Sequence, residues 1–270
     1  MRRMIHHRER PPESNRHYHP NELELRAVAE LRHRIYSCDE LGMPSGWLHR
    51  GVTDVELLRF LRARNGDLSA ATAMLREHAV WRGSAVGPDR PPPDPSSAPF
   101  AAHIVSVIRR HVYWTGVTTE DCAVLVVESA VFQVATQHTD VFLRTLVDIL
   151  EEGKMGYGVG SSRKIVLLID RLASAVDGDD AIHSLSYPAL FAVLRNICYT
   201  FQNNYPECLY RAFVAPVNVV LTSLYSLFGY LIKPSSRRKI VLVPNGVWEF
   251  WRQELPPSTV PKRWGGLHGI

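Results

Sequence analysis

The sequence predicts an α/β protein with a largely parallel β-sheet, preceded by a small all-helical lobe. Beyond residue 100, short apolar runs rich in β-branched residues alternate with longer segments of helical periodicity. Before residue 88, apolar residues recur at helical spacing, and a proline-rich stretch then separates the two regions. Because a strand that is followed by a helix usually pairs in parallel with the next strand, the alternation indicates a parallel sheet.

The N-terminal lobe is predicted from three helical segments. The first runs from Glu22 to Arg34. The second opens at Thr53, a residue type favoured at helix N-caps, and stops near Asn65-Gly66, which tolerate a left-handed backbone. The third runs from Leu68 to Arg82. We therefore divide the chain into a flexible basic arm (1–20), a helical lobe (21–87), a proline-rich linker (88–99) and an α/β domain (100–270).

The α/β domain is predicted from four strands and three helices. The strands are Ala123–Glu128, Lys164–Asp170, Arg211–Ala215 and Lys239–Val243. The helices are Asp140–Glu152, Asp180–Phe201 and Val217–Ile232. The sequence shows no internal repeat.

Composition narrows the classes of partner. The chain is 46% hydrophobic, which excludes general disorder, and its net charge of +4 is mild. Five arginines lie in the first twenty residues, so the positive charge is concentrated in a tail and gives little support to nucleic-acid binding. The four cysteines have no CxxC spacing and no secretory leader precedes them, so we expect a reduced, cytoplasmic protein. Four histidines near the N-terminus lack further ligands at fixed spacing, and we expect no metal site.

The segment LLRFLRAR, Leu57 to Arg64, places an arginine in an unexpected position. As a helix it has an apolar face made of Leu57, Leu58, Phe60 and Leu61. Arg59 and Arg62 are expected on the opposite side, whereas Arg64 falls among the apolar residues. A permanent cation on that face predicts an anionic partner. Alternatively, Arg64 interacts with the helix dipole in the last turn and extends outward to solvent.

Four motifs follow one another along most of residues 50 to 266. They are LLRFLRAR followed by a helix ending in WR, then NNYPECLYRAFVA, KPSSRRKI and LPPSTVPKRWGG. In kind and in order they resemble the motifs of the CRAL-TRIO family of phosphatidylinositol-transfer proteins and carriers of lipophilic ligands. The resemblance implies a floor of β-strands, helical walls, and a mobile gate helix that closes a cavity holding one lipid.

The resemblance also implies a binding site for a phosphoinositide headgroup. Carried over by motif, its residues are Arg64, Glu207, Ser236 and Lys239. Arginine and lysine supply charge for a phosphodiester, while a serine hydroxyl and a carboxylate suit the hydroxyl groups of an inositol ring. A bound phospholipid is thus the expected ligand, with no catalytic residue, metal or cofactor.

Two positions depart from family members that also carry phosphatidylcholine. In those proteins hydroxyl side chains face inward from the strand that matches KIVLLID, whereas here the matching positions are Ile165 and Leu167. The preceding strand offers Val126 in place of an aromatic hydroxyl. Choline-lipid exchange is therefore in doubt, and a sterol-like or isoprenoid molecule suits this apolar wall better as a second ligand.

The uncharged run from Ala212 to Ile232 permits two interpretations. Its length suits a membrane-spanning helix. Pro216, Asn218 and a strand-like beginning favour instead a strand followed by a helix, Val217 to Ile232, that acts as the gate. The gate residues expected to cover the cavity and enter the membrane interface are Leu224, Leu227, Phe228 and Leu231.

Two further signals have weaker functional interpretations. GYGVGSS, Gly156 to Ser162, resembles a phosphate-binding glycine loop, but it follows a helix and leads into a strand, so we interpret it as a connection. Asp170 ends a strand and, with His183, could serve an α/β enzyme, although a turn or helix-capping role is favoured.

We therefore expect a protein that binds phosphatidylinositol and transfers it between membranes, or presents it to lipid-modifying enzymes such as a phosphoinositide kinase. The alternatives are a carrier of another lipophile with a vestigial phosphate site and an α/β enzyme. Contacts with membrane surfaces are expected to be peripheral and transient.

Overall fold

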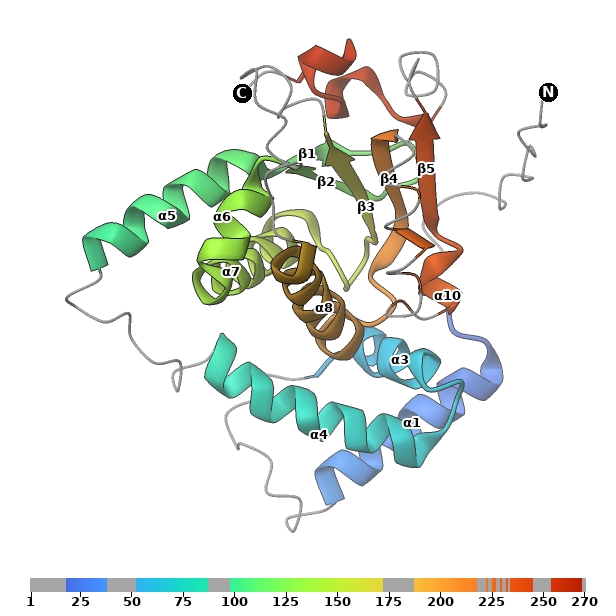
Figure 1. Cartoon of the computed structure of the whole chain (residues 1–270). Helices are drawn as coiled ribbons and strands as arrows, with labels where there is room; N and C mark the ends of the chain where they lie inside the picture. Colours follow the sequence, from blue (N-terminus) through green and yellow to red (C-terminus); the bar gives the residue numbers. More distant parts are fainter. Residues whose placement is uncertain are drawn as a thin grey trace.

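The computed structural model describes residues 18–37, 52–86, 98–171, 187–217, 234–244 and 254–268, together with residues 222, 225, 226, 229 and 232. Its centre is a five-stranded sheet with the order β1-β2-β3-β4-β5 (Figure 1). The strands are β1 (Val112–Val117), β2 (Ala123–Glu128), β3 (Ile165–Asp170), β4 (Leu209–Val217) and β5 (Ile240–Pro244). The strands from β2 to β5 pair in parallel, so the predicted fold class is confirmed.

The strand β1 was not predicted from the sequence. It pairs antiparallel with β2 at the edge of the sheet, and the register shifts between Trp114 and Gly116. Five of its six residues are only partly buried, so VYWTGV lacks the apolar continuity of the other strands. An edge strand with a bulge therefore gave no clear sequence pattern.

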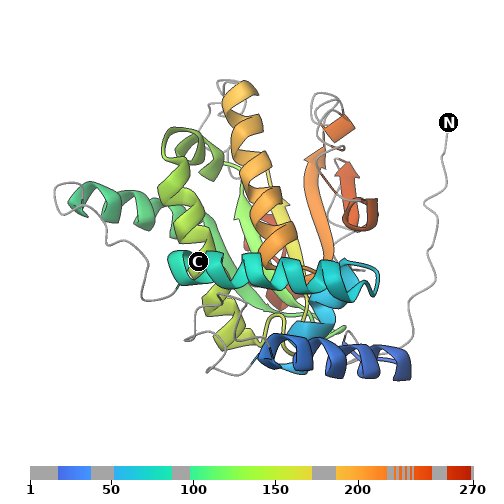
Figure 2. The ribbon, with the colours of Figure 1, turned by 90° about the horizontal axis from the view of Figure 1, so that it is seen from below.

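Four helices lie on one face of the sheet (Figures 1 and 2). They are α5 (Ala98–His111), α6 (Val131–Gln137), α7 (Thr139–Tyr157) and α8 (Tyr187–Asn204). Ile108, Phe142 and Val193 from these helices pack with Leu125 of β2 in one apolar core. The sequence predicted α7 and α8 but missed α5 and α6. Pro99, assigned to the linker, lies in the first turn of α5, where proline is tolerated.

The C-terminal segment covers the opposite face of the sheet. It contains two short 3₁₀ turns, η3 (Pro257–Thr259) and η4 (Lys262–Trp264). Leu255, Val260 and Trp264 from this segment pack against residues such as Val126 and Val166 of the sheet. The sheet is therefore enclosed by helices on one side and by the chain terminus on the other.

An ion-pair cluster with two buried carboxylates fastens this segment to the sheet. Arg263 donates to Asp170 and to Glu128, which end the paired strands β3 and β2. Glu128 also accepts hydrogen bonds from His111 and Tyr113. Burial opposes ionisation of Glu128, but hydrogen bonds from His111 and Arg263 outweigh it and lower the pKa of this carboxyl. Asp170 is thus an ion-pair partner of Arg263. The residues after Arg171 that it was predicted to cap lie outside the described residues, as does His183.

The N-terminal lobe consists of α1 (Glu22–Ser37), α3 (Asp54–Ala63) and α4 (Leu68–Ala85), which share their own apolar core. Thr53 and Glu56 form the reciprocal capping box at the start of α3, which confirms the predicted N-cap. The lobe lies beneath the amino ends of β3, β4 and β5 (Figure 1), and the view from below shows α1 and α4 in front of the sheet (Figure 2).

The predicted gate helix falls largely outside the described residues. Leu224, Leu227, Phe228 and Leu231 are all outside them, whereas Val217, its predicted first residue, ends β4. Among the helices that the structure describes, none has the length and apolarity needed to cross a membrane. The glycine-rich segment is a connection as predicted, because it follows α7, where Gly158 adopts the left-handed conformation, and leads into β3.

We predict that Arg263→Ala lowers the free energy of unfolding by about 3 kcal/mol, because Glu128 and Asp170 remain buried without the cation that neutralises them. Urea denaturation at neutral pH measures the change. Lys262→Ala, next to it on an exposed position, is the control and should change stability by less than about 0.5 kcal/mol. Equal stability of both variants would show that the cluster does not fasten the terminus.

Candidate functional site

An incompletely buried apolar strip crosses the helix-facing side of the sheet. Strand pairing aligns two rows of residues, Leu125-Leu167-Ala212-Ile240 and Val127-Ile169-Val214-Leu242. At the β2 end the helices bury both rows, whereas five members farther along are only half-buried. These five, which we call the apolar strip, are Leu167, Ile169, Val214, Ile240 and Leu242.

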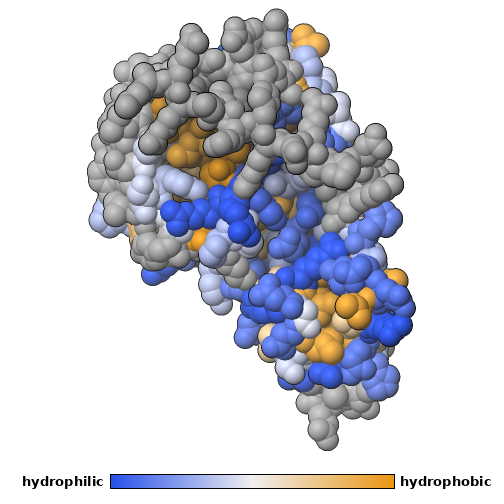
Figure 3. Space-filling view, turned by 90° about the vertical axis from the view of Figure 1, so that its right-hand side faces the viewer, coloured by the Kyte–Doolittle hydropathy of each residue, from blue (hydrophilic) through white to orange (hydrophobic). Residues whose placement is uncertain are grey.

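The space-filling view shows an apolar hollow on the face that carries β5 and α10, bordered by a band of hydrophilic residues (Figure 3). An apolar strip that the described helices leave half-covered suits a hydrophobic ligand. Of the two cavity residues predicted on β3, Leu167 belongs to this strip. Ile165 is only 2% exposed and packs in the core with α7.

Charged residues gather where the three adjacent strands begin. Lys164 directly precedes β3, Glu207 precedes β4 by two residues, and Lys239 directly precedes β5. The ammonium nitrogen of Lys239 lies 3.4 Å from Glu207 Oε2, and that of Lys164 lies 4.0 Å from the same oxygen. We call these three residues the strand-start cluster. It lies at the amino ends of β3, β4 and β5, the same strands that carry the apolar strip.

The structure brings together three of the four predicted headgroup residues. Ser236 lies in the short helix α10 (Pro234–Arg237), and its carbonyl accepts a hydrogen bond from the backbone amide of Lys239 at 2.9 Å. Lys239 in turn contacts Glu207, whose backbone has a φ of 56° in the turn before β4. The three residues therefore occupy neighbouring positions at the amino ends of β4 and β5.

The fourth predicted residue, Arg64, is not joined to the other three. It caps the C-terminal end of α3 and is half-buried, and no described residue accepts a hydrogen bond from its guanidinium. Its helix neighbour Arg62 instead pairs with Glu24 at 2.8 Å and donates to the carbonyl of His19. Hydrogen bonding to Glu24 raises the pKa of Arg62, and Glu207 contributes to the same shift.

Sequence reasoning missed Lys164 and Tyr18. The ammonium of Lys164 lies 5.4 Å from the centre of the Tyr18 ring, and the Tyr18 hydroxyl donates to the carbonyl of Glu207 at 3.4 Å. One signal was available: the tetrapeptide KIVL begins at both Lys164 and Lys239, so the two strands start identically.

Comparison with known proteins places the chain in a family. Residues 109–266 match the family model for the CRAL/TRIO domain, and residues 27–77 match that for the CRAL/TRIO N-terminal domain. The chain belongs to the CRAL/TRIO family. The resemblance seen in the motifs is thereby confirmed.

One relative and one solved structure extend the comparison. A protein of Kluyveromyces lactis named phosphatidylinositol transfer protein SFH5 is 22% identical over 221 residues, covering 80% of this chain and 69% of that protein. The crystal structure of Sfh5 has a TM-score of 0.59 with 17% identity, over 92% of this chain and 88% of that one. That structural likeness shows the shared fold.

Arg59 of α3 lies on the side of the helix opposite to the apolar face, as predicted, but it is buried there. Arg59 is 4% exposed, because the side of α3 that faces away from α1 and α4 is covered by the CRAL/TRIO domain. Its guanidinium contacts Cys208 and lies 3.9 Å from Glu56, which also binds Lys154 of α7 at 2.6 Å. A helical pattern separates core from solvent but does not reveal a second packing partner.

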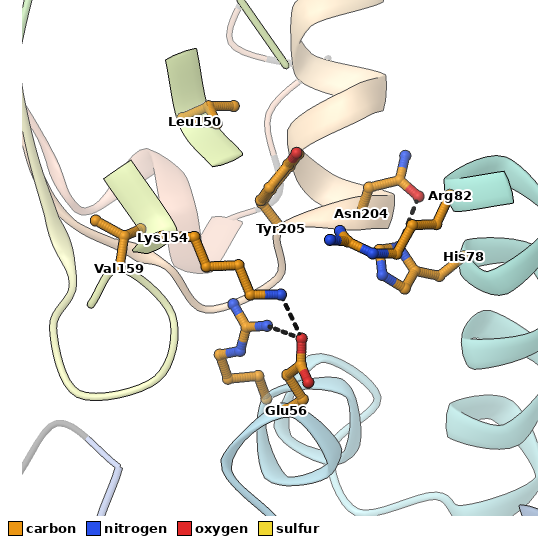
Figure 4. A pocket seen from close by; sticks show the side chains of 9 residues that line it. Glu56, His78, Arg82, Leu150, Lys154, Val159, Asn204 and Tyr205 are labelled. Atoms are coloured by element: carbon orange, nitrogen blue, oxygen red, sulfur yellow. Dashed lines mark hydrogen bonds and ion pairs between the residues drawn. The ribbon is translucent and has the colours of Figure 1, made fainter. Parts of the chain in front are cut away.

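Polar contacts join the helical lobe to the CRAL/TRIO domain around a small crevice (Figure 4). Arg82 of α4 binds Glu151 of α7 with two hydrogen bonds of 3.0 and 2.6 Å. The ring of His78 lies 3.1 Å from the Asn204 amide oxygen, and burial lowers the pKa of His78 to about 4. His78 is therefore neutral at physiological pH, and the lobe is held by a buried pair and a neutral hydrogen bond.

We predict that Arg82→Met destabilises the protein by about 3 kcal/mol, because Glu151 is only 14% exposed and would lose its cation. A matched control exists in Arg109, which binds Glu152 with the same two-bond geometry but is 39% exposed. Arg109→Met should cost less than about 1 kcal/mol. Chemical denaturation of both variants measures the difference, and similar losses would contradict the assignment of Arg82 to the buried lobe contact.

Proposed function

We propose that this CRAL/TRIO protein binds phosphatidylinositol, with the acyl chains on the apolar strip and the headgroup at the strand-start cluster. The observation that carries the proposal is that β3, β4 and β5 carry a half-buried apolar strip along their length and a charged cluster at their amino ends. A phospholipid has the same two-part chemistry. The name of the SFH5 relative supports the choice of inositol lipid.

The predicted headgroup residues have complementary chemistry. Lys239 supplies a cation for the phosphodiester, and Arg64, which has no hydrogen-bond acceptor among the described residues, supplies a second. Ser236 donates or accepts through its hydroxyl, and Glu207 accepts from ring hydroxyls while it orients Lys239. We therefore retain Arg64, Glu207, Ser236 and Lys239 as the proposed headgroup residues.

The side chains of the apolar strip support a second lipophilic ligand. Leu167, Ile169, Val214, Ile240 and Leu242 offer no hydrogen-bond partner on this surface. A polar choline headgroup placed there would lose its hydration without compensation. A sterol-like or isoprenoid molecule has no such headgroup to dehydrate, so we propose a lipid of this kind as the second ligand that is exchanged for phosphatidylinositol. If the phosphate site is vestigial, this lipid would be the principal ligand.

The proposed role is lipid transfer between membranes or presentation to a lipid-modifying enzyme such as a phosphoinositide kinase. The protein would act in the cytoplasm and contact membranes transiently. Covalent chemistry is not part of the proposal, because Asp170, the acid considered for catalysis, is 2% exposed and paired with Arg263. The predicted gate residues Leu224, Leu227, Phe228 and Leu231 would enter the membrane interface during exchange.

Mass spectrometry of lipid extracted from the purified protein tests the proposed ligand. We expect an inositol phospholipid. A different lipophile alone would favour the second carrier function, and turnover of a substrate without any bound lipid would favour an enzyme. Either result would overturn the proposal.

We predict that Lys239→Ala slows transfer of labelled phosphatidylinositol between vesicles by about tenfold, because the phosphodiester loses a charged hydrogen bond. Arg64→Ala should have an effect of similar size. Arg109→Ala serves as the control, because this arginine lies on α5 and pairs with Glu152. Native transfer rates in both site variants would refute the headgroup assignment.

A further inference from the structure

Lys164 is a largely buried cation that finds no hydrogen-bond acceptor among the described residues. Its side chain is 15% exposed, and no described residue accepts a hydrogen bond from its ammonium group. The carboxylate that lies nearest, Glu207, is 4.0 Å away, beyond hydrogen-bond length. An ammonium group has three donors, and leaving them unsatisfied in a buried position is costly.

The surroundings of Lys164 disfavour its positive charge. Burial lowers the pKa of Lys164, and the neighbouring charges of Lys239 and Arg62 lower it further, whereas Glu207 raises it. Glu207 is also shared, because Lys239 lies closer to it than Lys164 does. The Tyr18 ring offers a cation–π contact at 5.4 Å, which supplies no hydrogen-bond acceptor.

One bound anion would neutralise the strand-start cluster. Two lysines face one carboxylate, so the strand-start cluster carries one excess positive charge. Arg62 does not change this balance, because it is paired with Glu24. A phosphodiester carries one negative charge and oxygen atoms that accept from an ammonium group, so it would neutralise the cluster and satisfy Lys164.

We propose that Lys164 binds the headgroup phosphate from the side of Glu207 opposite to Lys239, and that the lysine pair selects phospholipids of net negative charge. The inference rests on the proposed function and adds a residue and a rule of selectivity to it. A zwitterionic headgroup would bring its own cation next to two lysines and leave the excess charge uncompensated. Inositol lipids and phosphatidic acid satisfy the rule, whereas phosphatidylcholine does not.

Transfer assays with the full chain test this inference. Donor vesicles contain labelled phosphatidylinositol or labelled phosphatidylcholine in a common neutral matrix, and the two transfer rates are compared. We expect Lys164→Gln to lower phosphatidylinositol transfer about tenfold and to reduce its preference over phosphatidylcholine. Lys164→Arg keeps the charge and should retain the preference. Lys262→Gln removes an exposed lysine elsewhere and should behave as the native protein.

The outcomes separate this inference from the proposed function. A native preference in Lys164→Gln overturns the inference alone. Transfer of phosphatidic acid but not phosphatidylinositol by the native protein overturns the proposed ligand and supports the charge rule. If Lys164→Gln fails to fold by circular dichroism, the lipid that co-purifies with the native protein decides: anionic phospholipid supports the rule, and phosphatidylcholine overturns it.

Discussion

Two lysines share one carboxylate where the helical lobe meets the CRAL/TRIO domain, and this arrangement organises the region. Glu207 stands between Lys164 and Lys239 because the strands β3, β4 and β5 are neighbours and all begin at the same edge of the sheet. The hydroxyl of Tyr18, at the start of the described lobe, donates to the backbone carbonyl of Arg163, next to Lys164, and to that of Glu207. Parallel topology thus brings three distant sequence positions together at one edge of the sheet.

The main strands and the longest helices were predictable because burial leaves a continuous apolar pattern. β2, for example, is buried along its whole length, and AVLVVE is apolar up to its last residue. Two of the three missed elements lack such a pattern: β1 is a half-buried edge with a bulge, and α6 has only seven residues. The third, α5, buries Ile104 and Ile108, and its first residues were assigned to the linker. Short and exposed elements are stabilised mainly by contacts with neighbouring elements in the fold, and the local sequence pattern does not predict such contacts.

The candidate site residues were predicted from the family motifs, and the structure brings together those whose motifs adjoin neighbouring strands. Ser236 and Lys239 are close in sequence, and both adjoin a strand that pairs with the one after Glu207. Arg59 and Lys164 were missed for a different reason. Their environments depend on how the helical lobe sits against the sheet, since Arg59 is buried by Cys208 and Glu56, and Lys164 is covered by Tyr18. A single-helix pattern contains no information about such docking.

The covering of the sheet by the C-terminal segment assigns different mechanical roles to its two faces. Arg263 locks that segment to the ends of β2 and β3, and Val260 and Trp264 fill the surface beneath it. If the proposed lipid binds on the apolar strip, the sheet is already covered on its other face. We therefore expect any displacement that accommodates lipids of different size to occur among the helices that face the strip.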